Sequence, residues 1–378
     1  MFCSGCAKLS LYSQNFSLLA FPLIPRYKPH MTKTEFLKDI ETRRGSRVIS
    51  YITSDRPGPL NARVAMDVVP LFSNQLRQMG RVTKIDLFLY SSGGDTMVPW
   101  RLVSMIREYC DTFSVLVPYK AHSAASMIAL GADEIVMSDL SELSPIDPST
   151  ANAFNPIDSS NPNNPNARIP ISVEDVVAFM ALAKDKFGIK DEIELGKIFM
   201  KFVDASPSIH PLALGNVNRT HNLIRLLAKR LLKSHKNKMR EDEMEKVVEF
   251  FTEKLHAHTY FIGRREAKED LGLSTVVEAN ADLARAMTGL YDIYAGEMGL
   301  GKTVWNPEIE IGPNAAQVKK TYTIACIETT GIANQFRFET ELRRQQVMAT
   351  HQTPQGPVQV QQEQVGFRVL KQGWVEGS

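Results

Sequence analysis

Two short segments of this sequence combine residue types that suit acyl transfer. The first is "SSGGD" (Ser91 to Asp95), which follows an apolar run, and the second is "AHSAASMIALGADEI" (Ala121 to Ile135), in which Ser123 and Ser126 stand among alanines where a helix should begin. A serine on such a turn can act as a nucleophile, because the unpaired N–H groups of the helix face the developing negative charge. Two glycines after a strand can offer further N–H groups to an oxyanion. Taken alone, the glycines are equally explained as a tight turn, and the serine segment is better explained by small residues that let the start of a helix approach a sheet closely.

The elements around these segments should bring them together. From residue 47 onward, β-rich runs alternate with helical patterns, which predicts right-handed crossovers and a largely parallel sheet. The two segments are about thirty residues apart and one crossover apart, so both turns should lie at the same sheet edge. The expected strands are 48–53, 85–90, 113–119 and 134–138, and the expected helices are 62–79, 96–109, 173–187, 220–233 and 241–256.

In this order the motifs resemble a known family. "LYSSGGD", "SAASMIALGADEIVM" and "LSPIDP" resemble the serine dehydrogenase proteinase family, which is similar to Clp-type and signal-peptide-peptidase-A-type serine peptidases of the crotonase-like superfamily. The resemblance spans roughly residues 49–277. It implies an α/β fold with a Clp/crotonase-like β-α superhelical core. It also implies an ATP-independent serine endopeptidase that cleaves unfolded or short polypeptides through an acyl-enzyme, without a cofactor or metal.

The sequence pattern and the extent of the resemblance divide the chain into three parts. Residues 1–40 are expected to be a poorly ordered arm, 41–280 a Clp/crotonase-like peptidase domain, and 281–378 a helix with a small β-rich appendage. The expected strands of the appendage lie within 321–330, 335–342 and 358–370.

Ser123 is the expected nucleophile. In peptidases of the signal-peptide-peptidase-A type, an Ile-Ala pair begins five residues after the serine and an Ala-Asp pair nine residues after it, and both Ile128 and Ala132 then select Ser123. The local "AAS-Met" pattern of Clp-type enzymes selects Ser126 instead, which stays the alternative. The oxyanion donors that the resemblance implies are the N–H groups of Ala124 and of Gly94 or Gly93.

The general base is left open by the resemblance. A Clp-type enzyme has a histidine about twenty-five residues after the serine, where this chain has Asp147, and a signal-peptide-peptidase-like enzyme has a lysine near the place of Lys184. His258 and His210 compete with them, because the pKa of imidazole is already near neutrality. We rank His258 first, then Lys184, then His210, with Asp147 next, and each of them is also explained as a structural or surface residue.

Other functions stay open beside the hydrolase. Crotonase relatives use the same N–H pair to hold an acyl-CoA thioester, with a carboxylate such as Asp147 as the base. A non-catalytic relative would bind peptides through the long Asn-, Pro- and Ser-rich loop at 149–170. The segment "GEMGLGKT" (Gly296 to Thr303) fits the phosphate-binding P-loop pattern, but it follows a helical segment instead of a strand. We interpret it as a chance match in a glycine-rich turn.

The net charge, the cysteine content and the apolar runs indicate which partners and which cellular location to expect. The net charge of +2 over 378 residues gives no reason to expect nucleic-acid binding. Four cysteines, including the pair Cys3 and Cys6, are too few for a disulfide framework and are typical of a reducing interior. No apolar run is long enough to span a membrane, and the first thirty residues lack a clear signal peptide. We therefore expect a cytoplasmic protein.

Two helical segments bear on assembly. Seven Lys and Arg residues lie between residues 225 and 240, which we interpret as a solvated helix face; the alternative is a peripheral membrane or membrane-protein partner. The helices at 220–233 and 241–256 have long apolar stripes. Together with the resemblance, these stripes predict a homo-oligomer with the β-rich tail on its outside.

Overall fold

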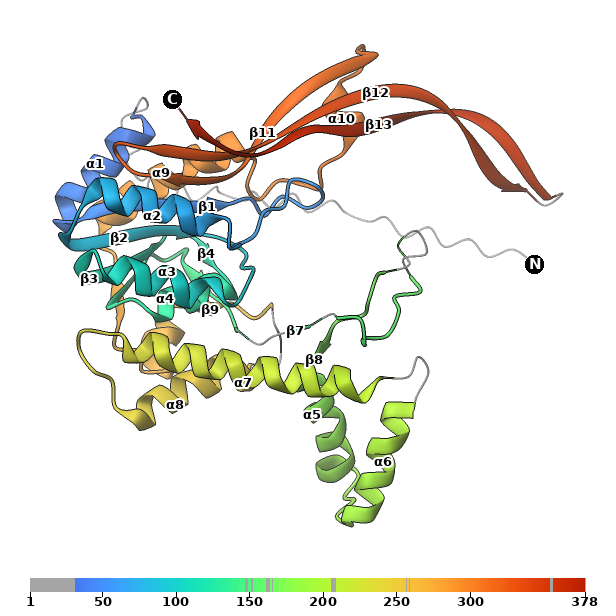
Figure 1. The fold of residues 1–378 in the computed structure, drawn as a ribbon, viewed down its shortest axis with the longest axis horizontal. Coiled ribbons are helices and arrows are strands. Elements are labelled where there is room, and N and C mark those ends of the chain that lie inside the picture. The colour runs from blue at the N-terminus through green and yellow to red at the C-terminus, as the bar shows by residue number, and fades with distance from the viewer. Residues whose placement is uncertain are drawn as a thin grey trace, which may run out of the picture.

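An eight-stranded sheet forms the centre of the computed structural model, which describes residues 31–146, 149–150, 152–160, 164, 166–204, 209–255, 257, 259–353 and 356–377 (Figure 1). In order across the sheet, the strands are β10 (Val276–Glu278), β5 (Glu134–Met137), β3 (Cys110–Val117), β2 (Val82–Tyr90), β1 (Arg47–Thr53), β11 (Gln317–Glu328), β12 (Ala333–Thr353) and β13 (Gly356–Gly377). The first five run parallel, and the last three are joined antiparallel. The predicted α/β class with a mostly parallel core and antiparallel C-terminal strands is confirmed.

Helices cover both faces of the parallel part. One face packs against α2 (Val68–Met79), α3 (Val98–Arg107) and α4 (Ala124–Leu130), and the other against α1 (Lys33–Arg44) and α9 (Ala281–Met298). An outer layer is formed by α7 (Pro211–Lys233), which packs on α3 and α4, and α8 (Glu241–Glu249), which packs on α7. Every residue of β2 from Ile85 to Tyr90 is therefore fully buried. A strand covered on both faces needs a continuous apolar run, which is how this strand is recognised in the sequence.

The chain on both sides of the predicted peptidase domain joins this core. Helix α1 begins with a capping box between Thr32 and Glu35 and buries Phe36 against α9. Residues 33–40, which the sequence assigns to a poorly ordered arm, are thus helical and packed, while 1–30 lie outside the described residues. Beyond the predicted division at residue 280, α9 and β11 also pack on the main sheet.

Smaller elements complete the fold around the carboxyl ends of the parallel strands. A three-stranded sheet contains β4 (Lys120–Ala121), β6 (Glu142–Leu143) and β9 (Ile262–Gly263), and a two-stranded one contains β7 (Ser149–Thr150) and β8 (Ile171–Ser172). The remaining helical elements are α5 (Val173–Ala181), η1 (Leu182–Lys186), α6 (Glu192–Asp204), η2 (Phe250–Lys254), η3 (Glu266–Asp270) and α10 (Pro307–Ile311). The helices α5 and α6 project from the body as a pair (Figure 1).

Most predicted elements are present, with shifted ends. The helix predicted from residue 62 begins at Val68, because Val64 instead forms a β-bridge with Gly94. The helix predicted from residue 220 begins nine residues earlier, at Pro211, and α6 was not predicted at all. No helix within the described ranges has both the length and the apolar character that crossing a membrane requires.

The apolar stripes of the predicted helices at 220–233 and 241–256 are buried within the subunit and are not available for assembly. Those side chains lie in the main core of the subunit: Ile224, Leu227, Leu231, Met244, Val247 and Phe251. The basic residues pair with the acidic run that follows them, as in Arg225 with Glu245 and Lys233 with Glu241. The stripes therefore give no physical support to the predicted homo-oligomer, which stays a prediction.

The P-loop match forms the end of a helix. Helix α9 runs to Met298, and Gly299 caps it in the left-handed conformation with φ 69°. A phosphate-binding loop must precede a helix, so that helix N–H groups meet the phosphates. Here the segment follows the helix, and the N–H of Gly301 donates to Asp55 Oδ1 over 3.1 Å. This geometry agrees with the interpretation as a chance match.

Candidate active site

The two glycine- and serine-containing turns meet at the carboxyl edge of the sheet. Ser91, the first residue after β2, forms a parallel bridge with Ala121. The N–H of Ser91 donates to the carbonyl of Lys120, and the N–H of His122 donates to the carbonyl of Ser91, each over 3.0 Å. The "SSGGD" turn and the start of α4 are thus held together by backbone hydrogen bonds, as the spacing predicts.

Ser123 has a strained backbone. Its φ of 50° and ψ of −116° make it the one non-glycine residue with positive φ among the described residues. Such a conformation costs on the order of 1–3 kcal/mol and persists only where the surroundings enforce it. The N–H of Ser123 donates to Ser144 Oγ over 2.8 Å, and the half-buried side chain stands at the N-cap of α4. Sharp, strained strand-to-helix turns are among the places where enzymes hold a nucleophilic serine.

Ser126 has a different position. It is fully buried, and its Oγ donates to the carbonyl of Ala121 over 2.6 Å. The same oxygen accepts the N–H of Ser144 over 2.9 Å. Ser126 therefore fastens α4 to the segment that holds Ser123, and it is not accessible to a substrate.

The two glycines are required by close contacts. A Cβ on Gly93, whose φ is +101°, would lie 2.7 Å from Cβ of Ser123. A Cβ on Gly94 would lie 2.1 Å from the carbonyl oxygen of Val64. Real side chains do not tolerate such contacts with fixed neighbours, so only glycine allows the first turn to reach the second.

Hydrogen bonds indicate which N–H groups suit an oxyanion. The N–H of Val64 donates to the carbonyl of Gly93 over 2.9 Å, and the N–H of Asp95 donates to the carbonyl of Val64 over 2.8 Å. Because both flanking bonds point toward Val64, the N–H of Gly94 is directed to the opposite side, where the second turn lies. The N–H of Gly93 is engaged with Ser91 Oγ over 3.1 Å.

The second donor follows from the helix. Ala124 is the first residue of α4, and the N–H of a first helical residue has no partner within its helix. Of the donors that the sequence analysis names, the geometry therefore favours Ala124 together with Gly94 over Gly93.

Charged side chains that the sequence analysis did not single out flank the turns. His122 Nε2 lies 3.0 Å from Glu142 Oε1 on β6, and burial raises the pKa of Glu142 while Lys120 opposes that rise. Although burial opposes it, the hydrogen bond to Asp55, 2.9 Å long, raises the pKa of Lys120. Lys120 is therefore held in its charged form, which disfavours a role as a neutral amine base. For Lys120 and His122, their position in or near "HSAAS" is the signal that could have found them.

Two of the four predicted general bases lie in the described part of the chain, and both of them are exposed. Lys184 is exposed in η1, and His210 is exposed at the start of α7. His210 Nδ1 accepts the N–H of Leu212 over 3.1 Å, and its ring stacks on Phe154 with centroids 5.0 Å apart. His258 and Asp147 lie outside the described residues.

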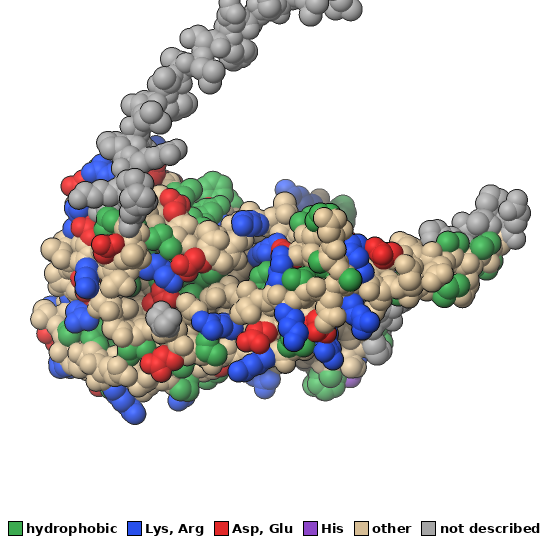
Figure 2. All heavy atoms as spheres, turned by 90° about the horizontal axis from the view of Figure 1, so that it is seen from above, with side chains coloured by type: hydrophobic (Ala, Val, Ile, Leu, Met, Phe, Trp, Pro, Cys, Tyr) green, Lys and Arg blue, Asp and Glu red, His purple; other side chains and the backbone are tan. Residues whose placement is uncertain are grey.

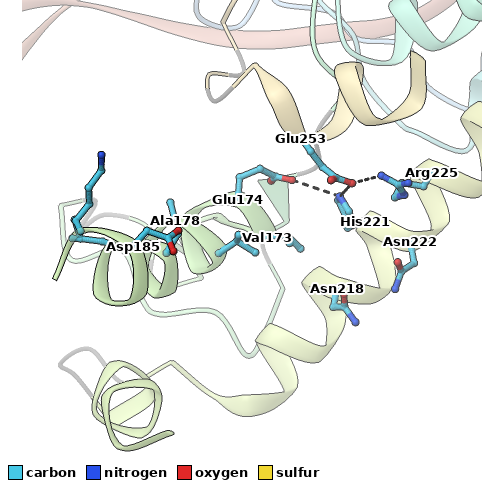
Figure 3. A pocket seen from close by; sticks show the side chains of 13 residues that line it. Val173, Glu174, Ala178, Asp185, Asn218, His221, Asn222, Arg225 and Glu253 are labelled. Carbon is cyan, nitrogen blue, oxygen red and sulfur yellow. Dashed lines mark hydrogen bonds and ion pairs between the residues drawn. The ribbon is translucent and has the colours of Figure 1, made fainter. Parts of the chain in front are cut away.

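A cavity of about 710 Å³ lies between α5, α7 and η2 (Figure 3). His221 points into it, with Nε2 3.6 Å from Glu174 Oε1 and 3.7 Å from Glu253 Oε1. The element η2, which lines this cavity, is hydrogen-bonded to the segment after Ser144: the N–H of Ile146 donates to the carbonyl of Phe251 over 2.8 Å. The sequence analysis missed His221, which sits in an ordinary helical pattern.

The described parts of the chain contain no preformed set of metal ligands. No group of three or more His, Cys, Asp or Glu side chains there is arranged to hold a metal ion. Cys110 and Cys326 are free and buried, and Cys3 and Cys6 lie outside the described residues.

Part of the chain matches a known protein family. Residues 4–160 match the family described as ClpP-like SDH-type serine proteinase, and this range includes both turns. The resemblance drawn from the motifs extended further, to about residue 277.

Two curated relatives are the uncharacterized proteins MJ1495 and MJ0137 of Methanocaldococcus jannaschii. They are 27% and 23% identical to this chain over 128 and 129 residues. These stretches cover 32% and 33% of this chain, and 44% and 45% of the relatives, so the chain spans less than half the length of the curated relatives that it matches.

Among solved structures, ClpP1 from Listeria monocytogenes aligns with a TM-score of 0.32 at 15% identity, covering 65% of this chain and 97% of that one. An enoyl-CoA hydratase from Mycobacterium avium subsp. paratuberculosis aligns with a TM-score of 0.22 at 15% identity, covering 50% and 85%. Both scores are low, and the fold of this chain is defined by its own sheet topology.

Proposed function

We propose that this chain, which over residues 4–160 belongs to the ClpP-like SDH-type serine proteinase family, is a serine hydrolase that acts through Ser123. The observation that carries the proposal is the strained backbone of Ser123, opposite the Gly93–Gly94 turn. Backbone strain at an element junction is retained where function requires it, and here it coincides with the serine that the motif register selects. The burial of Ser126 and its two hydrogen bonds support Ser123 over Ser126 as the nucleophile.

The proposed reaction is acyl transfer to Ser123 and then to water. Ser123 Oγ attacks the carbonyl carbon of the scissile amide, and its proton passes through a general base to the leaving amine. The negative charge on the carbonyl oxygen of the tetrahedral intermediate is stabilised by the N–H groups of Gly94 and Ala124, which are fixed before the reaction. Water then attacks the resulting ester, which releases the carboxylate product and restores Ser123.

The proposed substrates are unfolded or short polypeptides, cleaved internally without ATP. The family description supports proteolysis, and the helix-end geometry of the only P-loop match in the sequence supports independence from ATP. A peptide amide is among the acyl donors whose tetrahedral intermediate two backbone N–H groups can stabilise.

A covalent probe tests the proposal. We expect a fluorophosphonate probe to label the full-length protein, with the modified peptide mapped by mass spectrometry to Ser123. Heat-denatured protein is the control, because labelling that survives denaturation reports no activated serine. A folded protein that never takes up the probe would overturn the hydrolase proposal and would leave the acyl-CoA and peptide-binding alternatives.

The general base can be tested by substitution. We expect Lys184→Ala and His210→Ala to change kcat/KM for a small ester by less than about threefold, because both side chains are exposed and His210 is engaged with Leu212 and Phe154. The pH dependence of kcat/KM should keep its shape in both variants. His258→Ala, measured in parallel, is the comparison that we expect to remove a rise near pH 6 to 7, the range of a histidine base. A large loss in Lys184→Ala would contradict this assignment.

A further inference from the structure

The long hairpin of β12 and β13 extends past the rest of the sheet. Strand β11 pairs with β12 only as far as Gln317 with Arg343, whereas β12 and β13 remain paired to Thr353 with Gly356. After Arg343, where the pairing with β11 ends, β12 and β13 project from the body as a two-stranded ribbon (Figure 1). We call residues 345–350 and 356–364 the distal ribbon. Among the described residues, neither of its outer edges pairs with another strand.

A two-stranded ribbon of this kind is poorly stabilised by itself. Isolated hairpins are marginally stable in water, and three or more strands with an apolar face are needed for a stable sheet. The distal ribbon nevertheless exposes apolar side chains: Met348 is 61% exposed, Val358 48% and Val360 44%. Burial of these apolar side chains against another surface would stabilise the ribbon.

The composition of the ribbon is unusual for an open edge. The eighteen residues from Gln345 to Gln362 contain no Asp, Glu, Lys or Arg. Charges resume where the ribbon rejoins the body, as in the 2.8 Å ion pair of Arg344 with Glu363. In the space-filling view the ribbon projects beyond the last charged side chains as a surface of hydrophobic and uncharged groups (Figure 2). Natural edge strands normally carry charges that prevent pairing, and this one lacks them.

We propose that the distal ribbon pairs edge to edge with the distal ribbon of a second copy of this chain. Two ribbons joined in this way make a four-stranded sheet, which meets the size that a stable sheet requires. In an edge-to-edge pair with twofold symmetry, the edge strand lies antiparallel to its own copy, so a charge near the axis would oppose a like charge from the other copy. A charge-free stretch of Gln, Val and Thr suits such self-pairing. This surface is separate from α7 and α8, whose apolar stripes are buried.

The experiment is sedimentation velocity of the full chain at micromolar concentration. Wild type should sediment as a dimer or larger assembly. Met348→Lys and Val360→Lys should each weaken self-association by at least about tenfold, because each brings one like charge from either copy into the uncharged stretch of the joined ribbons. The matched control is Val277→Lys, a 36% exposed valine on β10 at the opposite edge of the sheet, which should assemble as wild type does.

Folding is checked separately by thermal melting. Should either lysine variant fail to fold, Gln361→Lys replaces it, because Gln361 is already polar and exposed and lies opposite Met348 in the register. A monomeric wild type overturns the proposal. So does an assembly that survives the ribbon variants, or one that the Val277 control also disrupts. The proposal does not depend on Ser123, whose labelling is measured independently.

Discussion

Ser123→Ala is expected to abolish probe labelling and to lower kcat/KM for an ester substrate by at least about a thousandfold, because it removes the nucleophile itself. Ser126→Ala is expected to keep the labelling and to lose stability instead. It leaves the buried carbonyl of Ala121 and the N–H of Ser144 without their partner, which costs about 1–3 kcal/mol. Thermal melting and labelling, measured on both variants, separate the two roles.

Ser123→Gly provides the control for strain. Glycine adopts a positive φ without steric cost, so this variant should be as inactive as Ser123→Ala but more stable by about 1–3 kcal/mol. Equal stability of the two variants would contradict the strain argument. Labelling that persists in Ser123→Ala but is lost in Ser126→Ala would show that the motif register is wrong.

Sequence reasoning located the two turns because local patterns determine them. The continuous apolar run of β2 requires a strand with both faces covered, and the Gly93–Gly94 pair marks its end. The start of α4 follows one crossover later, and parallel neighbours end at one edge. Spacing alone therefore brought "SSGGD" and "HSAAS" together.

Long-range packing was not predictable in the same way. Strand β11 extends the main sheet by pairing Cys326 with Ile52, far apart in sequence, and no local pattern in β11 distinguishes this from a separate appendage. The docking of α1 depends likewise on contacts such as Phe36 with Gly289, where a side chain larger than glycine would collide. Such pairings depend on which surfaces are left uncovered after the core has formed.

The flanking charges were missed for a similar reason. His122 and Glu142 are twenty residues apart in the sequence, and only the pairing of β4 with β6 brings their side chains to 3.0 Å. The Lys120–Asp55 pair joins β4 to the segment that follows β1. A residue such as Lys120 could be a base or a permanent cation, and its carboxylate partner, which the sequence does not reveal, favours the cation.

Gly94→Ala is expected to reduce kcat/KM at least about a hundredfold, the loss typical for one oxyanion donor. The added Cβ would lie 2.1 Å from the carbonyl oxygen and 2.6 Å from the nitrogen of Val64, and backbone atoms cannot move aside as a flexible side chain can. The bridge between Val64 and Gly94 must therefore open, which turns the Gly94 N–H away from Ser123. Overpacking of this kind also costs about 1–3 kcal/mol of stability.

The matched control for that change is Gly296→Ala. Gly296 lies in α9, and a Cβ added there would meet no atom within 4 Å, so alanine should stabilise the helix by up to about 1 kcal/mol and leave kcat/KM unchanged. Rates are compared below the melting temperature of Gly94→Ala, so that unfolding does not account for lost activity. A folded Gly94→Ala variant with the activity of wild type would refute the role of this N–H. Gly296→Ala tests the P-loop match as well, because a phosphate-binding glycine that approaches its ligand closely would not tolerate the added methyl group.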